Sequence, residues 1–341
     1  MITTKYFNYK QIANLAGLHL IWLTAWSTFV AAIYSFFEWQ WMTIPLVPLT
    51  LVGTAVAFFV GFKNNQAYDR LWEARKIWGA IVNSSRSFAS MVNAFHTRKP
   101  ETEEIGLVKK QLVYRHIAWL YTLKDQLLIP TEWEHMSRER SFPSINLKRH
   151  RQIKAGFPDY LRTPIFQKKY LSDEEFETQE QYKNFATHLI SKQAKDLVSL
   201  RNADAITDFE HMQLQNCQND FYDFQGQAER IKKFPVPRQF ANSGFIFIVI
   251  FIVMLPLGLV SEFSKLGDWG IWTCIPFCVI VGWIYIIMEL VGDYSENPFG
   301  GLMFDIPMLS ICRTIEIDLL QIIGENEDLP EPIASKNGVL A

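Results

Sequence analysis

Four long apolar segments constrain this chain more than any other feature of its sequence. They cover residues 14–37, 44–62, 240–260 and 270–291. A helix needs about 20 mostly apolar residues to cross the hydrocarbon core of a bilayer, and each segment is close to that length. Because the bilayer core holds no water to satisfy backbone groups, each segment is expected to be a transmembrane helix.

The charged residues gather between the second and third apolar segments. This middle region has apolar residues at three- and four-residue steps, as in "QLVYRHIAWLYTLKDQLL", which is typical of amphipathic helices. We therefore predict an all-α membrane protein with four transmembrane helices per subunit and a large helical cytosolic region. The expected regions are two membrane spans in 1–62, cytosolic helices in 63–237, two further spans in 238–291, a cytosolic helical segment in 292–324 and a flexible tail in 325–341.

The basic residues predict the orientation of these spans. Lysine and arginine follow the second span and precede the third, whereas the turn "EWQWMT" has none and the loop "SEFSKLGDWG" has one. Because cytoplasmic flanks carry the excess of basic residues, both termini and the middle region are expected on the cytoplasmic side.

The sequence offers no catalytic pattern. It has no phosphate-binding glycine-rich loop, no H-E-x-x-H and no G-x-S-x-G motif, and its seven histidines lack metal-ligand spacing. The net charge of −2 does not favour a nucleic-acid partner. We expect no enzyme activity, no cofactor and no bound metal.

The second apolar segment continues directly into a polar helical pattern, "TAVAFFVGFKNNQAYDRLWEARKIWG". Positions four apart lie on nearly the same side of a helix. One such row consists of Thr54, Phe58 and Phe62, and the row beside it consists of small residues, Gly53, Ala57 and Gly61. Two interpretations fit this pattern. The phenylalanines either face lipid or fill a subunit core, or copies of the helix surround an axis and form hydrophobic rings that gate ions by dewetting. Small residues would then let neighbouring helices approach closely.

The polar continuation resembles the bestrophin family, especially its bacterial members. The matching residues follow the Gly61–Phe62 pair and include Asn64, Asn65, Asp69, Arg70, Trp72, Glu73 and Arg75. A second family motif, "ENPFG", contains Asn297, Pro298, Phe299 and Gly300 and precedes "DIPMLSICRTIEIDLL". The resemblance extends over essentially the whole chain.

The resemblance implies a homopentameric channel in a bacterial inner membrane, with the second span lining a narrow neck. The family's three neck positions fall on Thr54, Phe58 and Phe62. The family's lower aperture falls near Phe209, with Ile206 as the alternative. The partners implied are other copies of the chain, membrane lipids and permeating ions.

Two departures from the family are visible. Thr54 has a hydroxyl where an aliphatic residue is usual, so the outer ring is expected to be wetter. Animal bestrophins have an acidic run after this motif that binds calcium, whereas Asp305 is the only acid in "GLMFDIP". We predict no calcium clasp there.

The permeating ion is left open by the residues themselves. Phenyl edges favour anions and phenyl faces favour cations. We expect small monovalent ions, with chloride first and a sodium- or potassium-conducting pore of the same fold as the alternative. Acids such as Asp69 and Glu73 are expected to pair with basic residues on their own helix. The alternative from another class is a membrane-anchored helical scaffold or signalling protein.

Overall fold

The computed structural model describes residues 1, 9–37, 40–94, 103–133, 163–302, 304–335 and 338–340. Part of the region expected at 63–237 therefore lies outside the described residues. The chain divides into two compact units. The first unit comprises 1–3, 71–234 and 297–341, and the second comprises 4–70 and 235–296.

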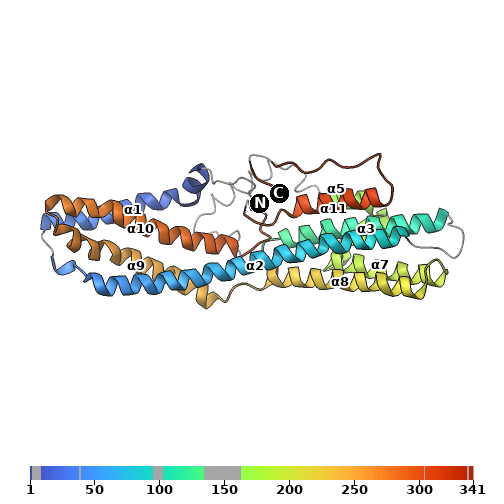
Figure 1. Cartoon of the computed structure of the whole chain (residues 1–341), viewed down its shortest axis with the longest axis horizontal. Helices are drawn as coiled ribbons and strands as arrows, with labels where there is room; N and C mark the ends of the chain where they lie inside the picture. Colours follow the sequence, from blue (N-terminus) through green and yellow to red (C-terminus); the bar gives the residue numbers. More distant parts are fainter. Residues whose placement is uncertain are drawn as a thin grey trace. The chain divides into compact units, whose positions relative to one another are not determined.

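The second unit contains the apolar helices. They are α1 (Tyr9–Phe37), the first part of α2 (Leu46–Ala94), α9 (Arg238–Ser264) and α10 (Asp268–Ser295). Each of the four helices is long and apolar enough to cross a membrane, as the sequence predicts. Helices α1, α9 and α10 pack against one another (Figure 1).

The core of the second unit is aliphatic and aromatic, with Leu49, Val56 and Val60 of α2 packing among residues of α9 and α10. The first turn of α10 requires glycine at position 270. A Cβ on Gly270 would lie 1.9 Å from the Phe263 carbonyl oxygen, which no side chain tolerates without a backbone shift.

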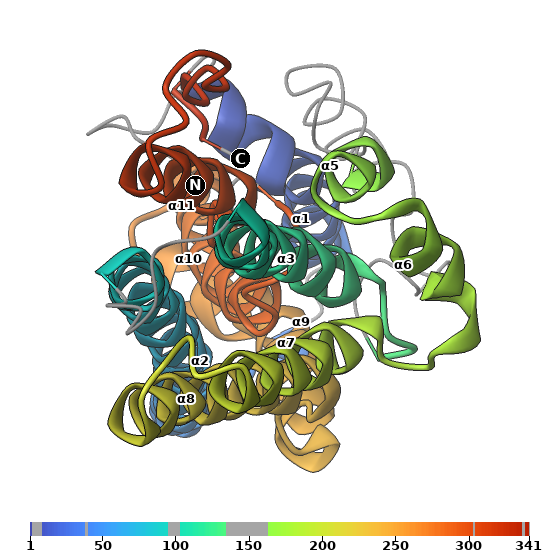
Figure 2. The same ribbon diagram turned by 90° about the vertical axis from the view of Figure 1, so that its right-hand side faces the viewer.

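The long regular elements of the first unit are all helices, as far as its described residues show. They are the second part of α2, α3 (Glu103–Leu128), α5 (Thr163–Tyr170), α6 (Asp173–Glu177), α7 (Phe185–Asn202), α8 (Asp208–Lys233) and α11 (Met308–Ile322), with a 3-10 turn at Thr178–Gln181. Helix α3 is central and packs against α5, α7, α8 and α11, as Figure 2 shows.

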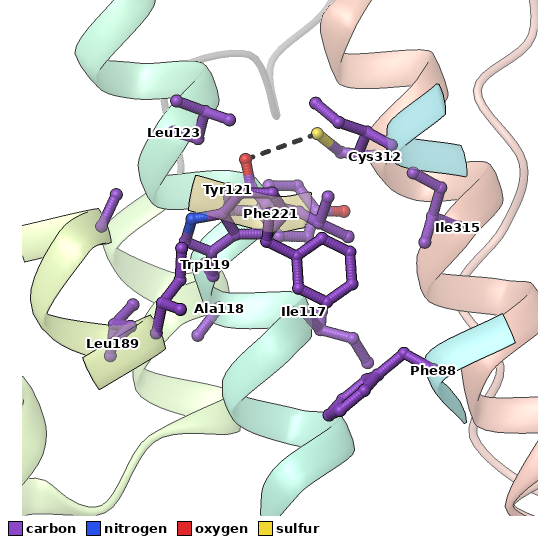
Figure 3. Close-up of a cluster of buried hydrophobic side chains, with 14 of the residues drawn as sticks. Phe88, Ile117, Ala118, Trp119, Tyr121, Leu123, Leu189, Phe221, Cys312 and Ile315 are labelled. Carbon is purple, nitrogen blue, oxygen red and sulfur yellow. Dashed lines mark hydrogen bonds between the residues drawn. The ribbon is translucent and has the colours of Figure 1, made fainter. Parts of the chain in front are cut away.

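The core of the first unit is rich in aromatic side chains (Figure 3). Phe88, Trp119 and Phe221 are fully buried and come from α2, α3 and α8. Each of these side chains stabilises the fold by roughly 2–3 kcal/mol through the apolar area it removes from water. The residues expected to form a flexible tail have contacts here, since Leu329, Ile333 and Val339 pack against this core.

Candidate functional site

The row of Thr54, Phe58 and Phe62 lies on the exposed side of α2. Phe58 is 69% exposed and Phe62 is 54% exposed within the chain. Val56 and Val60, on the other side of the helix, are buried in the core of the second unit. The subunit's own packing therefore leaves this row uncovered.

The side chains of the row contact one another and their own helix. The rings of Phe58 and Phe62 meet edge to face, with centroids 4.6 Å apart and planes at 86°. The Thr54 hydroxyl donates to the Thr50 carbonyl oxygen at 2.9 Å. Its proton is thus used by the helix backbone, and only its oxygen lone pairs face outward.

The neighbouring row of small residues has three different environments. Gly53 is buried, and a Cβ there would come within 2.8 Å of the Phe251 ring on α9. Its carbonyl oxygen accepts a hydrogen bond from the Tyr285 hydroxyl at 3.0 Å. Ala57 is half-buried, and Gly61 has no atom within 4 Å of a Cβ position. Glycine at position 53 therefore serves packing within the subunit, whereas the space beside Gly61 is open.

Lys63 follows the Gly61–Phe62 pair and lies on the buried side of α2, where only 6% of it is exposed. Its ammonium group donates to the Glu289 carboxylate at 2.5 Å and also to the Asp293 carboxylate. Both acids lie on α10, one helical turn apart. The four-residue spacing of Glu289 and Asp293 in the sequence places both acids on one side of α10, where they can bind one cation.

The polar motif after the neck positions is held to residues far away in the chain. Asn64 is half-buried, and a Cβ on Gly292 would lie 2.4 Å from its side-chain oxygen. Arg70 donates through Nε to the Glu296 carbonyl oxygen at 2.8 Å. The Glu296 carboxylate in turn accepts from the Val236 backbone at 2.9 Å. Glu296 thereby joins the end of α10 to both α2 and the segment preceding α9.

One acid of this motif, Glu73, does not pair as the sequence suggests. Glu73 forms its ion pair with Arg230 of α8, at 2.6 Å, rather than with a basic residue of α2. The prediction of same-helix pairs is therefore wrong for Glu73, because α8 brings a closer guanidinium to it. Four other residues of the motif are exposed: Asn65, Asp69, Trp72 and Arg75.

The two aperture candidates differ sharply in environment. Helix α7 ends with Asp204 in a left-handed conformation (φ 55°), and the Ala205 backbone donates to the Leu200 carbonyl oxygen at 2.9 Å. Helix α8 then begins with a capping box between Thr207 and Glu210. This turn buries Ile206 in the core of the first unit and exposes Phe209.

The second family motif forms a compact turn. The Asn297 side chain accepts from the Phe299 backbone at 3.1 Å, and the Pro298 carbonyl accepts from the Ile306 backbone at 3.1 Å. Phe299 is fully buried, and Gly300 lies against the Asp305 carboxylate. These residues are structural elements of the first unit.

A buried polar cluster follows this turn on α11. Glu316 accepts hydrogen bonds from the hydroxyls of Tyr121 and Tyr170, each at 2.5 Å. Arg313 lies 3.1 Å from the same carboxyl group. Burial, together with the adjacent carboxylate, raises the pKa of both tyrosines, so both hydroxyls stay protonated as donors. Within the described part of the chain, no three histidine, cysteine or acidic side chains gather as they would around a metal ion.

Residues 10–321 match the family model described as bacterial/fungal bestrophin protein. The chain belongs to the bestrophin family. The family and the four apolar helices together make it a membrane protein. The match includes α2 with its exposed row and both motifs that the sequence analysis assigned to bestrophins.

Several bestrophin relatives are similar over most of their length. The voltage-dependent anion channel-forming protein YneE of Escherichia coli O157:H7 is 26% identical over 305 residues, covering 88% of this chain and 85% of that protein. The voltage-dependent anion channel-forming protein RSc3414 of Ralstonia nicotianae is 27% identical over 297 residues, covering 84% of this chain and 81% of that protein.

A solved bestrophin structure has the same fold. The crystal structure of a bacterial bestrophin homolog from Klebsiella pneumoniae superimposes with a TM-score of 0.73 at 19% identity, covering 91% of this chain and 98% of that one. The all-helical architecture predicted from the sequence therefore agrees with a known bestrophin fold.

Proposed function

We propose that this protein is an anion channel of the bestrophin type, formed by several copies of the chain around a pore lined by α2. The observation that carries the proposal is the exposed row of Thr54, Phe58 and Phe62, which the subunit leaves uncovered while Val56 and Val60 of the same helix are buried. Phenylalanine facing lipid has no need of an adjoining hydroxyl and a polar continuation on the same side. A helix that lines a pore and then a water-filled vestibule accounts for both.

The assembly follows from the family resemblance, which implies five copies. In such a ring the three side chains of each copy form stacked constrictions, and Phe58 with Phe62 makes the narrowest, least wetted part. The open space beside Gly61 is where an adjacent copy can approach. Phe209, exposed at the start of α8, is our candidate for the lower aperture.

Chloride is the ion we assign to this pore. The relatives named above as anion channel-forming support an anion, and aromatic edges directed at the axis supply partial positive charge without a formal charge. A sodium- or potassium-conducting pore is the second candidate, because Asp69 is exposed about two turns beyond Phe62 on α2.

We propose a bacterial inner membrane as the location of the channel, with both termini and the first unit on the cytoplasmic side. The basic residues that flank the second and third spans support this orientation. Transport is passive and needs no catalytic group.

The deciding experiment is current through purified protein in a planar bilayer under a sodium chloride gradient. We expect a reversal potential near the chloride equilibrium value. The double variant Phe58→Ala, Phe62→Ala is expected to carry a several-fold larger current, because a wider and more hydrated neck lowers the dewetting barrier. Phe245→Ala is the matched control, since it truncates a similarly exposed phenylalanine on α9.

Each outcome has a distinct meaning. A reversal potential near the sodium value would replace the anion channel by the cation channel. Equal currents from the double variant and the wild type would remove the neck from these positions. If neither the wild type nor the double variant carries current, although both are folded and assembled, the membrane-anchored scaffold becomes the better hypothesis.

A further inference from the structure

Lys63 and Phe62 are adjacent on α2, about 100° apart around its axis, and Lys63 is buried whereas Phe62 is exposed. The Phe62 side chain is exposed on the row that we assign to the neck, whereas Lys63 extends into the subunit toward α10. The Lys63 charge thus lies behind the wall of the innermost neck ring rather than in the pore itself.

The site on α10 is built to receive this lysine. Glu289 and Asp293 are one helical turn apart, and Gly292 between them lets α2 approach closely. A Cβ on Gly292 would lie 2.4 Å from the Asn64 side-chain oxygen and 3.6 Å from the Lys63 side chain. Burying charged groups is costly unless they pair, so two acids kept beside one lysine at this position call for a reason beyond packing.

Charge behind a pore wall acts on the ion in the pore. A helix with its side chains is about 10–12 Å across, so the distance from the ammonium group to an ion passing Phe62 is comparable with the Debye length of about 8–10 Å. The intervening medium is protein rather than water, which screens less. The Lys63 charge and the two carboxylates beside it are repeated in every copy around the ring.

We propose that Lys63 is a specificity-determining residue that favours anions by offsetting the Glu289 and Asp293 carboxylates behind the neck. This inference rests on the proposed channel function. The chloride-to-sodium permeability ratio should then follow the net charge of the cluster formed by Lys63, Glu289 and Asp293. It should do so whichever of the three residues is changed.

Three variants test the inference through the chloride-to-sodium permeability ratio. Lys63→Met removes one positive charge and is expected to lower the ratio about fivefold. Glu289→Gln removes one negative charge and is expected to raise the ratio by a similar factor. The double variant Lys63→Met, Glu289→Gln restores the original net charge and is expected to restore the wild-type ratio.

The double variant separates electrostatics from structure. If Lys63 only held α2 on α10, the double variant would still lack the ion pair and would remain altered. Lys265→Met is the matched control, since it removes a lysine that pairs with Glu262 at the exposed C-terminal end of α9. This variant is expected to leave the permeability ratio unchanged. Should Lys63→Met fail to fold, Glu289→Gln and the double variant still decide the matter.

The outcomes distinguish this inference from the proposed function. Equal ratios in all folded, conducting variants would overturn the role of Lys63 while leaving the channel intact. A double variant that keeps the altered ratio of a single variant would also overturn it. Absence of current from the wild type and from the neck double variant would overturn the channel and this inference together.

Discussion

Ile206 and Phe209 are three residues apart at the start of α8, yet 6% of Ile206 is exposed and 84% of Phe209 is exposed. The capping box at Thr207 fixes where the helix begins, so the residue before the cap turns into the core and the residue in the first turn faces outward. The family resemblance left both as aperture candidates, and we propose Phe209 because its side chain is exposed.

The two residues are therefore expected to respond differently to truncation. Phe209→Ala should raise single-channel conductance with little effect on stability, because it shortens an exposed side chain. Ile206→Ala should lower the free energy of unfolding by about 2–4 kcal/mol, because it leaves a cavity in the core. Single-channel recording and chemical denaturation in detergent measure the two effects. Unchanged conductance in Phe209→Ala would remove this residue from the aperture.

Substitutions of the two glycines near the neck, Gly53 and Gly61, are also expected to have different effects. Gly53→Ala should destabilise the subunit by about 1–3 kcal/mol, because the new methyl group meets the Phe251 ring. Gly61→Ala adds a methyl group where the subunit has open space, so the subunit itself should keep its stability. Thermal unfolding and cross-linking of the assembled protein distinguish them. An assembly defect in Gly61→Ala alone would place a neighbouring copy at that position, and normal stability of Gly53→Ala would contradict the packing argument.

Acid should destabilise the first unit through His116. Its ring is fully buried among Phe88, Trp119 and Phe221, and Nε2 lies 2.8 Å from the Ser85 hydroxyl. Burial lowers the pKa of His116 to about 3 from its ordinary value of 6.5. Between these two values the unfolded chain binds a proton that the folded chain excludes. The contribution of the neutral ring to the free energy of unfolding is therefore complete above pH 6.5. Between pH 6.5 and about pH 3 it falls by about 1.4 kcal/mol for each pH unit.

The variant His116→Gln tests this pH dependence. It cannot titrate, so its free energy of unfolding should fall less steeply than that of the wild type between pH 6 and pH 4. Urea titrations at several pH values provide the two slopes, and the carboxylates common to both proteins cancel in their difference. Parallel slopes would show that His116 is protonated in the folded state.

Calcium chelation is expected to leave the current unchanged. Asp305 is buried, and its carboxylate accepts from the Leu302 backbone at 2.8 Å, so it is engaged in its own turn. Asp305→Asn should cost about 1 kcal/mol of stability without creating or removing calcium dependence, because the amide weakens one charge-assisted hydrogen bond. Bilayer recording with and without a chelator makes the comparison. Closure on chelation would refute the prediction.

Much of the fold was accessible from the sequence because its signals are local. Twenty-residue apolar runs identify membrane helices wherever they pack. The helical pattern that runs on past Phe62 predicts that α2 continues, as the 49-residue helix Leu46–Ala94 confirms. The four-residue spacing of Thr54, Phe58 and Phe62 likewise places them on one side of a helix before any partner is known.

Tertiary structure decided which side of each helix is covered and what each charge contacts. Lys63 and Glu289 are 226 positions apart, and Glu73 and Arg230 are 157 apart, so no periodicity connects them. The sequence determined the helices and the rows along them, since helical geometry repeats every 3.6 residues. Only packing between distant segments could bury Lys63 beside two acids, set Gly53 against Phe251 and leave the phenylalanine row uncovered, because burial depends on which segments meet.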